Sequence, residues 1–132
     1  MKMTTISQNK YDVTPDNKQE LADSLCKKYS SNPVIALDVA DILKVIGNAT
    51  AIAVTEVNGD NIAEVISEIA NYQYGNNLVM VLSAKPNPKL TMEELHPFEK
   101  WTNTLGNDTN IIWSLSENQS LPNLRQIAVI SA

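Results

Sequence analysis

Hydrophobic and polar positions follow two rhythms along the chain, and these predict strands and helices in turn. Four short runs predict strands, and three of them, 51–57, 78–82 and 126–131, are apolar on both faces, as is typical of strands covered on two sides. Elsewhere apolar positions recur every three or four residues, the spacing of amphipathic helices. The strands are expected at 51–57, 78–82, 109–115 and 126–131, and the helices at 15–29, 38–46, 62–72 and 91–105.

The stretch 34–46 (VIALDVADILKVI) is the most informative one, because an apolar run turns into a helix that begins with two acids. Asp38 stands at the expected N-cap, and Asp41 follows three residues later, the spacing of a capping box. Both carboxylates lie where the helix dipole favours negative charge. Taken alone, this pattern indicates two acids that start a helix, and a loop presented to a partner is the alternative.

The order of these elements indicates the fold class. A strand, a helix and a strand between 51 and 82 form a βαβ unit, so its two strands are expected to be parallel with a right-handed crossover. We predict an α/β (α+β) domain: a four-stranded mixed sheet, two crossover helices packed on it and one or two N-terminal helices. Residues 1–13 are expected to be a flexible arm, and 14–132 a single domain.

Two residues are expected to shape the helices. Gly75 is expected to close the helix over 62–72 as its C′ residue, and Pro97 to kink the last helix or restart it after one turn.

Charge and hydropathy argue against several partners. The formal net charge is −5, and Arg125 is the single arginine. Nucleic acids and anionic membrane surfaces both select for clustered Lys and Arg, which the sequence does not contain. No run approaches the ~18 apolar residues of a membrane span, and the N-terminus has no apolar signal region. We therefore expect a cytoplasmic protein that binds neither nucleic acid nor membrane.

Residue types that carry chemistry are scarce. The four glycines form no phosphate-binding motif, so we expect no nucleotide site and no cofactor. Cys26 is a single thiol without a visible base, and His96 a single histidine on a charged helix start, so neither a nucleophile nor a metal site is expected. Trp101 and Trp113 are interpreted as core or interface aromatics.

Five short motifs, in order, make residues 34–131 resemble the C-terminal, activation-type domain of the tubulin/FtsZ family. The first has the form of the family's acidic loop, and the others match a turn, a helix start and two strands. They are IALDVAD at 35–41, GDN at 59–61, LTMEEL at 90–95, DTNII at 108–112 and RQIAVISA at 125–132.

The resemblance implies a fold and a role. In that family the acidic loop reaches into the neighbouring subunit of a filament and helps to position the water that attacks the γ-phosphate of GTP. By resemblance Asp38 and Asp41 take the acidic positions, and Ala36, Leu37, Asp38 and Asp41 form a loop that contacts a partner. Ala36 replaces the family's asparagine, and the GTP-binding half has no counterpart in this sequence.

Four functions follow as hypotheses. The first is a non-enzymatic interaction or assembly module, with a cytoskeletal or cell-division role, that docks on a tubulin/FtsZ-like GTPase or on itself. The second is a GTPase-activating partner that supplies Asp38 and Asp41 in trans. The third is a small metabolic enzyme on a related α/β sandwich, which the single arginine disfavours because dianionic substrates select for clustered arginines. The fourth is a fold whose interface has drifted to a new homo-oligomer.

Overall fold

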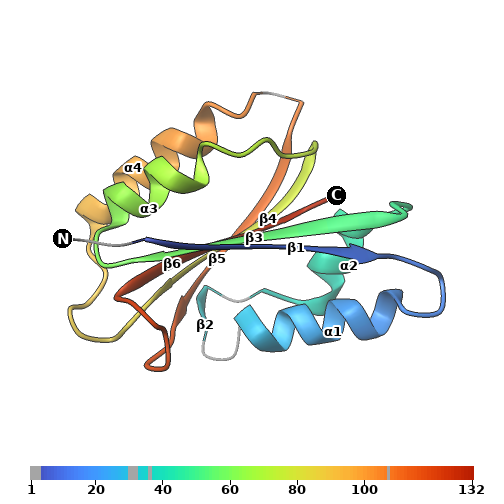
Figure 1. Cartoon of the computed structure of the whole chain (residues 1–132), viewed down its shortest axis with the longest axis horizontal. Coiled ribbons are helices and arrows are strands. Elements are labelled where there is room, and N and C mark those ends of the chain that lie inside the picture. The colour runs from blue at the N-terminus through green and yellow to red at the C-terminus, as the bar shows by residue number, and fades with distance from the viewer. Residues whose placement is uncertain (1–3, 30–32, 36, 107) are drawn as a thin grey trace.

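The computed structural model describes residues 4–29, 33–35, 37–106 and 108–132, and the side chains of 33–35 are not described. Strands and helices alternate along most of the chain (Figure 1). The strands are β1 (Thr5–Asp12), β2 (Pro33–Ile35), β3 (Ala51–Gly59), β4 (Asn77–Ala84), β5 (Asn110–Glu117) and β6 (Arg125–Ser131). The helices are α1 (Lys18–Tyr29), α2 (Val39–Ile46), α3 (Ile62–Ile69) and α4 (Met92–Asn103).

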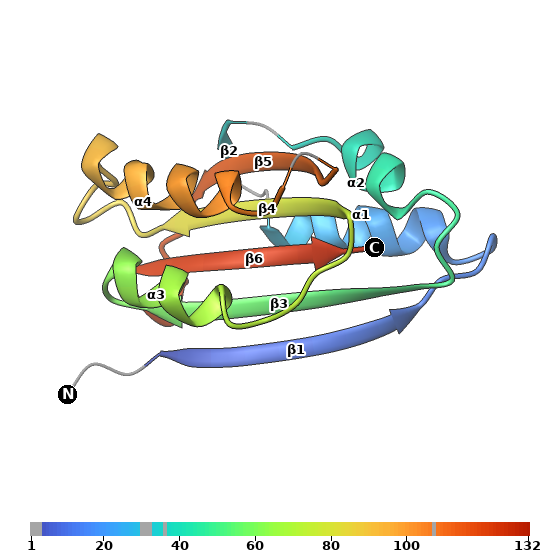
Figure 2. The ribbon, with the colours of Figure 1, turned by 90° about the horizontal axis from the view of Figure 1, so that it is seen from above.

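The strands form one mixed sheet in the order β1-β3-β6-β4-β5-β2, five long strands and the three-residue β2 (Figure 2). Only β4 and β5 pair in parallel, and every other neighbouring pair is antiparallel. Strands β3 and β4 run in the same direction, as expected of the βαβ unit, but β6 lies between them. The prediction that the last strand is interior to the sheet is confirmed.

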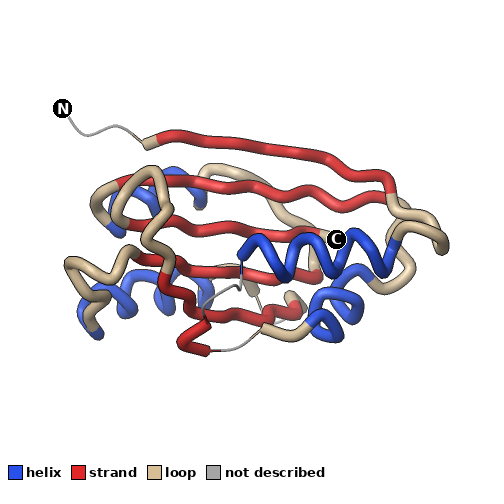
Figure 3. The backbone as a smooth tube through the Cα atoms, turned by 90° about the horizontal axis from the view of Figure 1, so that it is seen from below, coloured by secondary structure: helices blue, strands red, loops and turns tan. Residues whose placement is uncertain are grey.

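Helices cover both faces of the sheet. Helices α3 and α4 lie on one face, and α1 and α2 lie on the other (Figures 1 and 3). Each face has its own apolar core: one includes Val65, Ile69 and Phe98 with inward residues of β4 and β6, and the other includes Leu25 and Ile42. Because β4 and β6 are buried on both faces, they read as continuous apolar runs in the sequence.

The N-terminal segment corrects one prediction. Residues 5–12, expected to be part of a flexible arm, form the eight-residue strand β1, which pairs along its length with β3. Seven of its residues are exposed, and the half-buried Tyr11 is its one hydrophobic side chain that packs against a core. The predicted four strands are present, and β1 and β2 are added at the two edges of the sheet.

The helix boundaries differ from the predicted ones for local reasons. The first helix begins at Lys18 rather than at 15, and residues 15–17 form a turn in which Thr14 and Asn17 exchange side chain to backbone hydrogen bonds of 2.8 and 3.2 Å. Helix α3 ends at Ile69 with Ala70 as its C-cap. Gly75 is therefore not its C′ residue, and its N–H donates to Ser131 Oγ at 2.7 Å.

Helix α4 continues through Pro97, so the predicted restart after one turn is wrong. Among the described residues, no helix is long and apolar enough to cross a membrane.

Candidate functional site

The acidic loop before α2 is held against α1 by one apolar side chain and one hydrogen bond. Leu37 is only 5% exposed and belongs to the core between α1, α2 and the sheet. Its carbonyl oxygen lies 3.3 Å from Cys26 Sγ, whose thiol donates to it. Because the thiol and the leucine side chain both fix Leu37, the next residue, Asp38, is held in position relative to α1 and α2.

Asp38 is the N-cap of α2 and is exposed to solvent. Its backbone is extended (φ −90°, ψ 153°), and its carbonyl accepts the N–H groups of Asp41 and Ile42 at 3.1 and 3.4 Å. The Asp41 carboxylate turns back, and its Oδ2 accepts the Asp38 N–H at 3.1 Å. The predicted capping box is therefore present: the Asp38 side chain faces the Asp41 backbone N–H, the Asp41 side chain faces the Asp38 N–H, and Asp38 stays exposed to solvent.

Negative charge gathers around the Cys26 thiol. Burial raises the pKa of the Cys26 thiol, and the nearby carboxylates of Asp38, Asp23 and Asp41 raise it further. The thiol therefore stays protonated at neutral pH, which disfavours a nucleophilic role. Asp23 was not singled out as a site residue, although its spacing of three from Cys26 on a helix places both side chains on one face.

Three of the four residues of the predicted contact loop are described, and they differ in exposure. Asp38 is exposed, Asp41 is half-buried and hydrogen-bonded to the loop, and Leu37 is buried as an anchor. Ala36 lies outside the described residues. Within the described part of the chain, no group of three or more His, Cys, Asp or Glu side chains is arranged to hold a metal ion.

The one arginine has a structural partner. Arg125 is 2% exposed, and its Nε and Nη2 donate to the two carboxylate oxygens of Glu94 at 2.8 and 3.0 Å. Its remaining donors reach the carbonyls of Leu124 and Pro88, both at 2.9 Å. All these partners belong to the same chain, so Arg125 connects α4 and the β4–α4 loop to β6.

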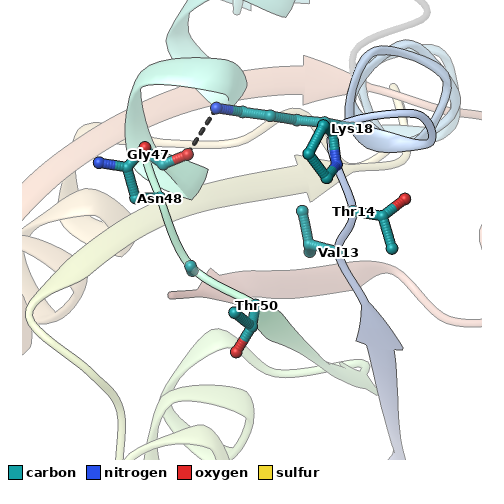
Figure 4. A pocket seen from close by; sticks show the side chains of 8 residues that line it. Val13, Thr14, Lys18, Gly47, Asn48 and Thr50 are labelled. Atoms are coloured by element: carbon teal, nitrogen blue, oxygen red, sulfur yellow. Dashed lines mark hydrogen bonds between the residues drawn. The ribbon is translucent and has the colours of Figure 1, made fainter.

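A hollow of about 460 Å³ lies between the β1–α1 and α2–β3 turns (Figure 4). Lys18 crosses it, and its ammonium donates to the carbonyl of Gly47, the C-cap residue of α2. A cation at this position satisfies a helix C-terminus and complements its dipole. The lysine thus connects the start of α1 to the end of α2, and its ammonium is hydrogen-bonded within the protein.

The aromatic and histidine side chains divide between core and surface. Trp101 is buried and packs edge-on against Phe98, with ring centroids 6.2 Å apart. Trp113 also packs on Phe98 but is 41% exposed, so it is both a core and a surface residue. His96 is exposed on α4.

Comparisons with known proteins place this fold. Neither the protein-family models nor the curated proteins give a match to the chain. Among solved structures, the W319Y mutant of FtsZ from M. jannaschii matches with a TM-score of 0.58 and 16% sequence identity. The match covers 92% of this chain and 42% of the FtsZ chain. The chain is therefore similar in fold to part of FtsZ and spans less than half of its length.

Proposed function

We propose that the protein is a non-enzymatic interaction module that docks on a tubulin-like GTPase through the acidic loop at the start of α2. The observation that carries this proposal is the exposed Asp38 carboxylate on a loop fixed by Leu37 and Cys26. The fold similarity to part of FtsZ supports the choice of partner. A docking surface gains affinity when its contact residues are held in place before binding, because less conformational freedom is then lost.

The charges around the loop indicate what the partner surface should carry. Asp23, Asp38 and Asp41 lie close enough to the Cys26 thiol to raise its pKa together. A partner surface with Lys, Arg or a nucleotide-bound cation would complement them. Because exposed charges are screened within about 10 Å at 0.1 M salt, binding should weaken as the salt concentration rises.

The enzyme alternative has less support. Recognition of a dianionic metabolite calls for arginine side chains that reach the ligand. Arg125 is instead buried in its pair with Glu94 and two backbone carbonyls. The described residues thus leave no arginine for a substrate.

Co-sedimentation with the tubulin-like GTPase of the same cell, in the presence of GTP, tests the proposal. The wild-type protein should bind at tens of micromolar, and Asp38→Ala should weaken binding about tenfold, the effect of losing one favourable ion contact. Asp16→Ala is the matched control, because Asp16 is an equally exposed acid in the turn before α1. Equal binding by the two variants, or no binding by the wild type, would refute the docking site.

A catalytic role in trans is the second candidate, and the exposure of Asp38 favours it, because an accessible carboxylate can orient a water molecule. In that case Asp38→Ala should lower the partner's rate of GTP hydrolysis under saturating conditions, where binding is complete. If turnover at saturation is the same with wild type, variant or buffer alone, the protein docks without contributing to catalysis.

A further inference from the structure

Strand β1 presents a long free edge. It is the first strand of the sheet order, so one side pairs with β3 while the backbone groups of the other side face outward. No helix covers it on either face of the sheet (Figures 2 and 3). Ile6, on this strand, is one of three large hydrophobic side chains that are exposed among the described residues.

The two edges of the sheet differ in the features that prevent pairing with another strand. Proteins protect exposed edges by short strands, prolines, bulges or clustered charges. The β2 edge has three of these features: it is three residues long, begins with Pro33 and shifts register against β5. Strand β1 has eight residues in unbroken register and no proline or glycine, and its charged residues, Lys10 and Asp12, lie near one end.

We propose that β1 pairs antiparallel with β1 of a second copy of this chain, extending the sheet across a two-fold axis. A two-fold axis perpendicular to the sheet leaves each face of the sheet on the same side in both copies. Directly facing side chains lie on the same face and successive side chains alternate between faces, so two facing residues must both have even numbers or both have odd numbers. The axis can therefore pass through a residue but not between two residues. This interface is separate from the acidic loop and does not depend on the proposed docking function.

Side-chain complementarity favours an axis through Gln8. In that register Tyr11 faces the second copy's Thr5, an aromatic and β-branched pair that stabilises sheets. Ile6 faces Lys10, whose aliphatic stem can cover the exposed side chain while its ammonium stays in water. An axis at residue 10 would place the two Lys10 side chains directly opposite each other, which is unfavourable.

The expected dimer is weak. One strand pair buries less than the ~1,200 Å² at the lower end of specific, stable interfaces. Each copy also carries a net charge of −5, which opposes association and is screened by salt. We therefore expect a dissociation constant on the order of 0.1 mM, reached more easily in salt.

Sedimentation equilibrium of the full chain from about 10 µM to 1 mM tests the dimer. The wild type should pass from monomer to dimer, and Gln8→Lys should stay monomeric because two lysines then meet at the axis. Gln119→Lys makes the same charge change on an exposed residue after β5 and should dimerise normally. A wild type that stays monomeric at 1 mM, or a dimer that Gln8→Lys leaves intact, would overturn the proposal.

Disulfide trapping tests the register. Facing Cα atoms in an antiparallel pair lie about 4.5–5.5 Å apart, within disulfide range, so Gln8→Cys should link two copies under mild oxidation. Asn9→Cys should not, because its counterpart lies two residues further along the strand, beyond the ~7 Å limit. Linkage through Asn9→Cys but not Gln8→Cys would contradict this register. Asp38→Ala should dimerise like the wild type, so failure of the docking function would leave this result unchanged.

Discussion

Replacing Glu94 by Gln should destabilise the protein far more than its position on a helix surface suggests. The Arg125 side chain beside it is 3% exposed, and the Glu94 side chain is 23% exposed. Two charge-assisted hydrogen bonds join them. A glutamine keeps the shape and can still accept the Thr91 N–H of the capping box, at 3.2 Å in the wild type, but it leaves the buried guanidinium without a counter-charge.

The magnitude follows from this geometry. Breaking a buried ion pair by removing one partner costs about 3–5 kcal/mol. Arg125 retains two carbonyl acceptors, and Glu94 keeps some contact with water, so we expect about 2–3 kcal/mol. For 132 residues this lowers the melting temperature by about 7–11 °C.

Urea unfolding followed by far-UV circular dichroism measures this loss directly. Glu93→Gln is the control: Glu93 is an exposed acid in the same first turn of α4, and its loss should cost less than about 0.5 kcal/mol. If Glu94→Gln and Glu93→Gln unfold at the same urea concentration, the ion pair does not stabilise the fold and the reasoning fails.

The pH dependence gives a second check with a definite sign. The hydrogen bond from Arg125, more than any other interaction, holds the pKa of Glu94 below its ordinary value of 4.5. Its stabilising contribution is therefore complete above that value and is lost as the pH falls through the lower, folded-state pKa. The stability gap between the wild type and Glu94→Gln should shrink as the pH falls below 4.5. A gap that widens on acidification would contradict this assignment.

Two further predictions concern the acidic loop and the packing of α3. Alkylation of Cys26 by iodoacetamide at pH 8.5 should be slower than that of a free thiol, because burial and three carboxylates raise the pKa of Cys26. The Asp23→Asn variant should be alkylated faster than the wild type, and an unchanged rate would contradict the role of Asp23. Gly59→Ala should destabilise the protein by about 1–3 kcal/mol in thermal unfolding, because the added Cβ would lie 2.8 Å from Val65 Cγ2 on α3. A melting temperature equal to that of the wild type would show that α3 shifts to accommodate the Cβ without cost.

The interior of the fold could be predicted from the sequence because its strands are marked by the residues they bury. Strands β4 and β6 are apolar on both faces, and the prediction that β6 is interior depended on that feature alone. Strand β1 could not be found in this way. Its sequence, TISQNKYD, is exposed at every position but Tyr11, so no alternation distinguishes it from a polar arm. Backbone pairing with β3 defines it, and side-chain patterns do not record that pairing.

The candidate site likewise has one feature that the sequence predicts and one that it does not. The capping-box spacing of Asp38 and Asp41 is local, so the sequence contained it, and the structure has the Asp41 carboxylate on the Asp38 N–H. The contact between Cys26 and the Leu37 carbonyl spans eleven residues and depends on how α1 packs beside the loop. Long-range contacts of this kind have no signature in one sequence.

Site-specific photocrosslinking tests the docking proposal most directly. A photoreactive amino acid placed at position 38, and separately at position 16 as the exposed control, would be irradiated in the source cell and its adducts identified by mass spectrometry. The account predicts an adduct between position 38 and the tubulin-like GTPase, with none from position 16. Absence of that GTPase from the position 38 adducts, while the protein is expressed and folded, would contradict it.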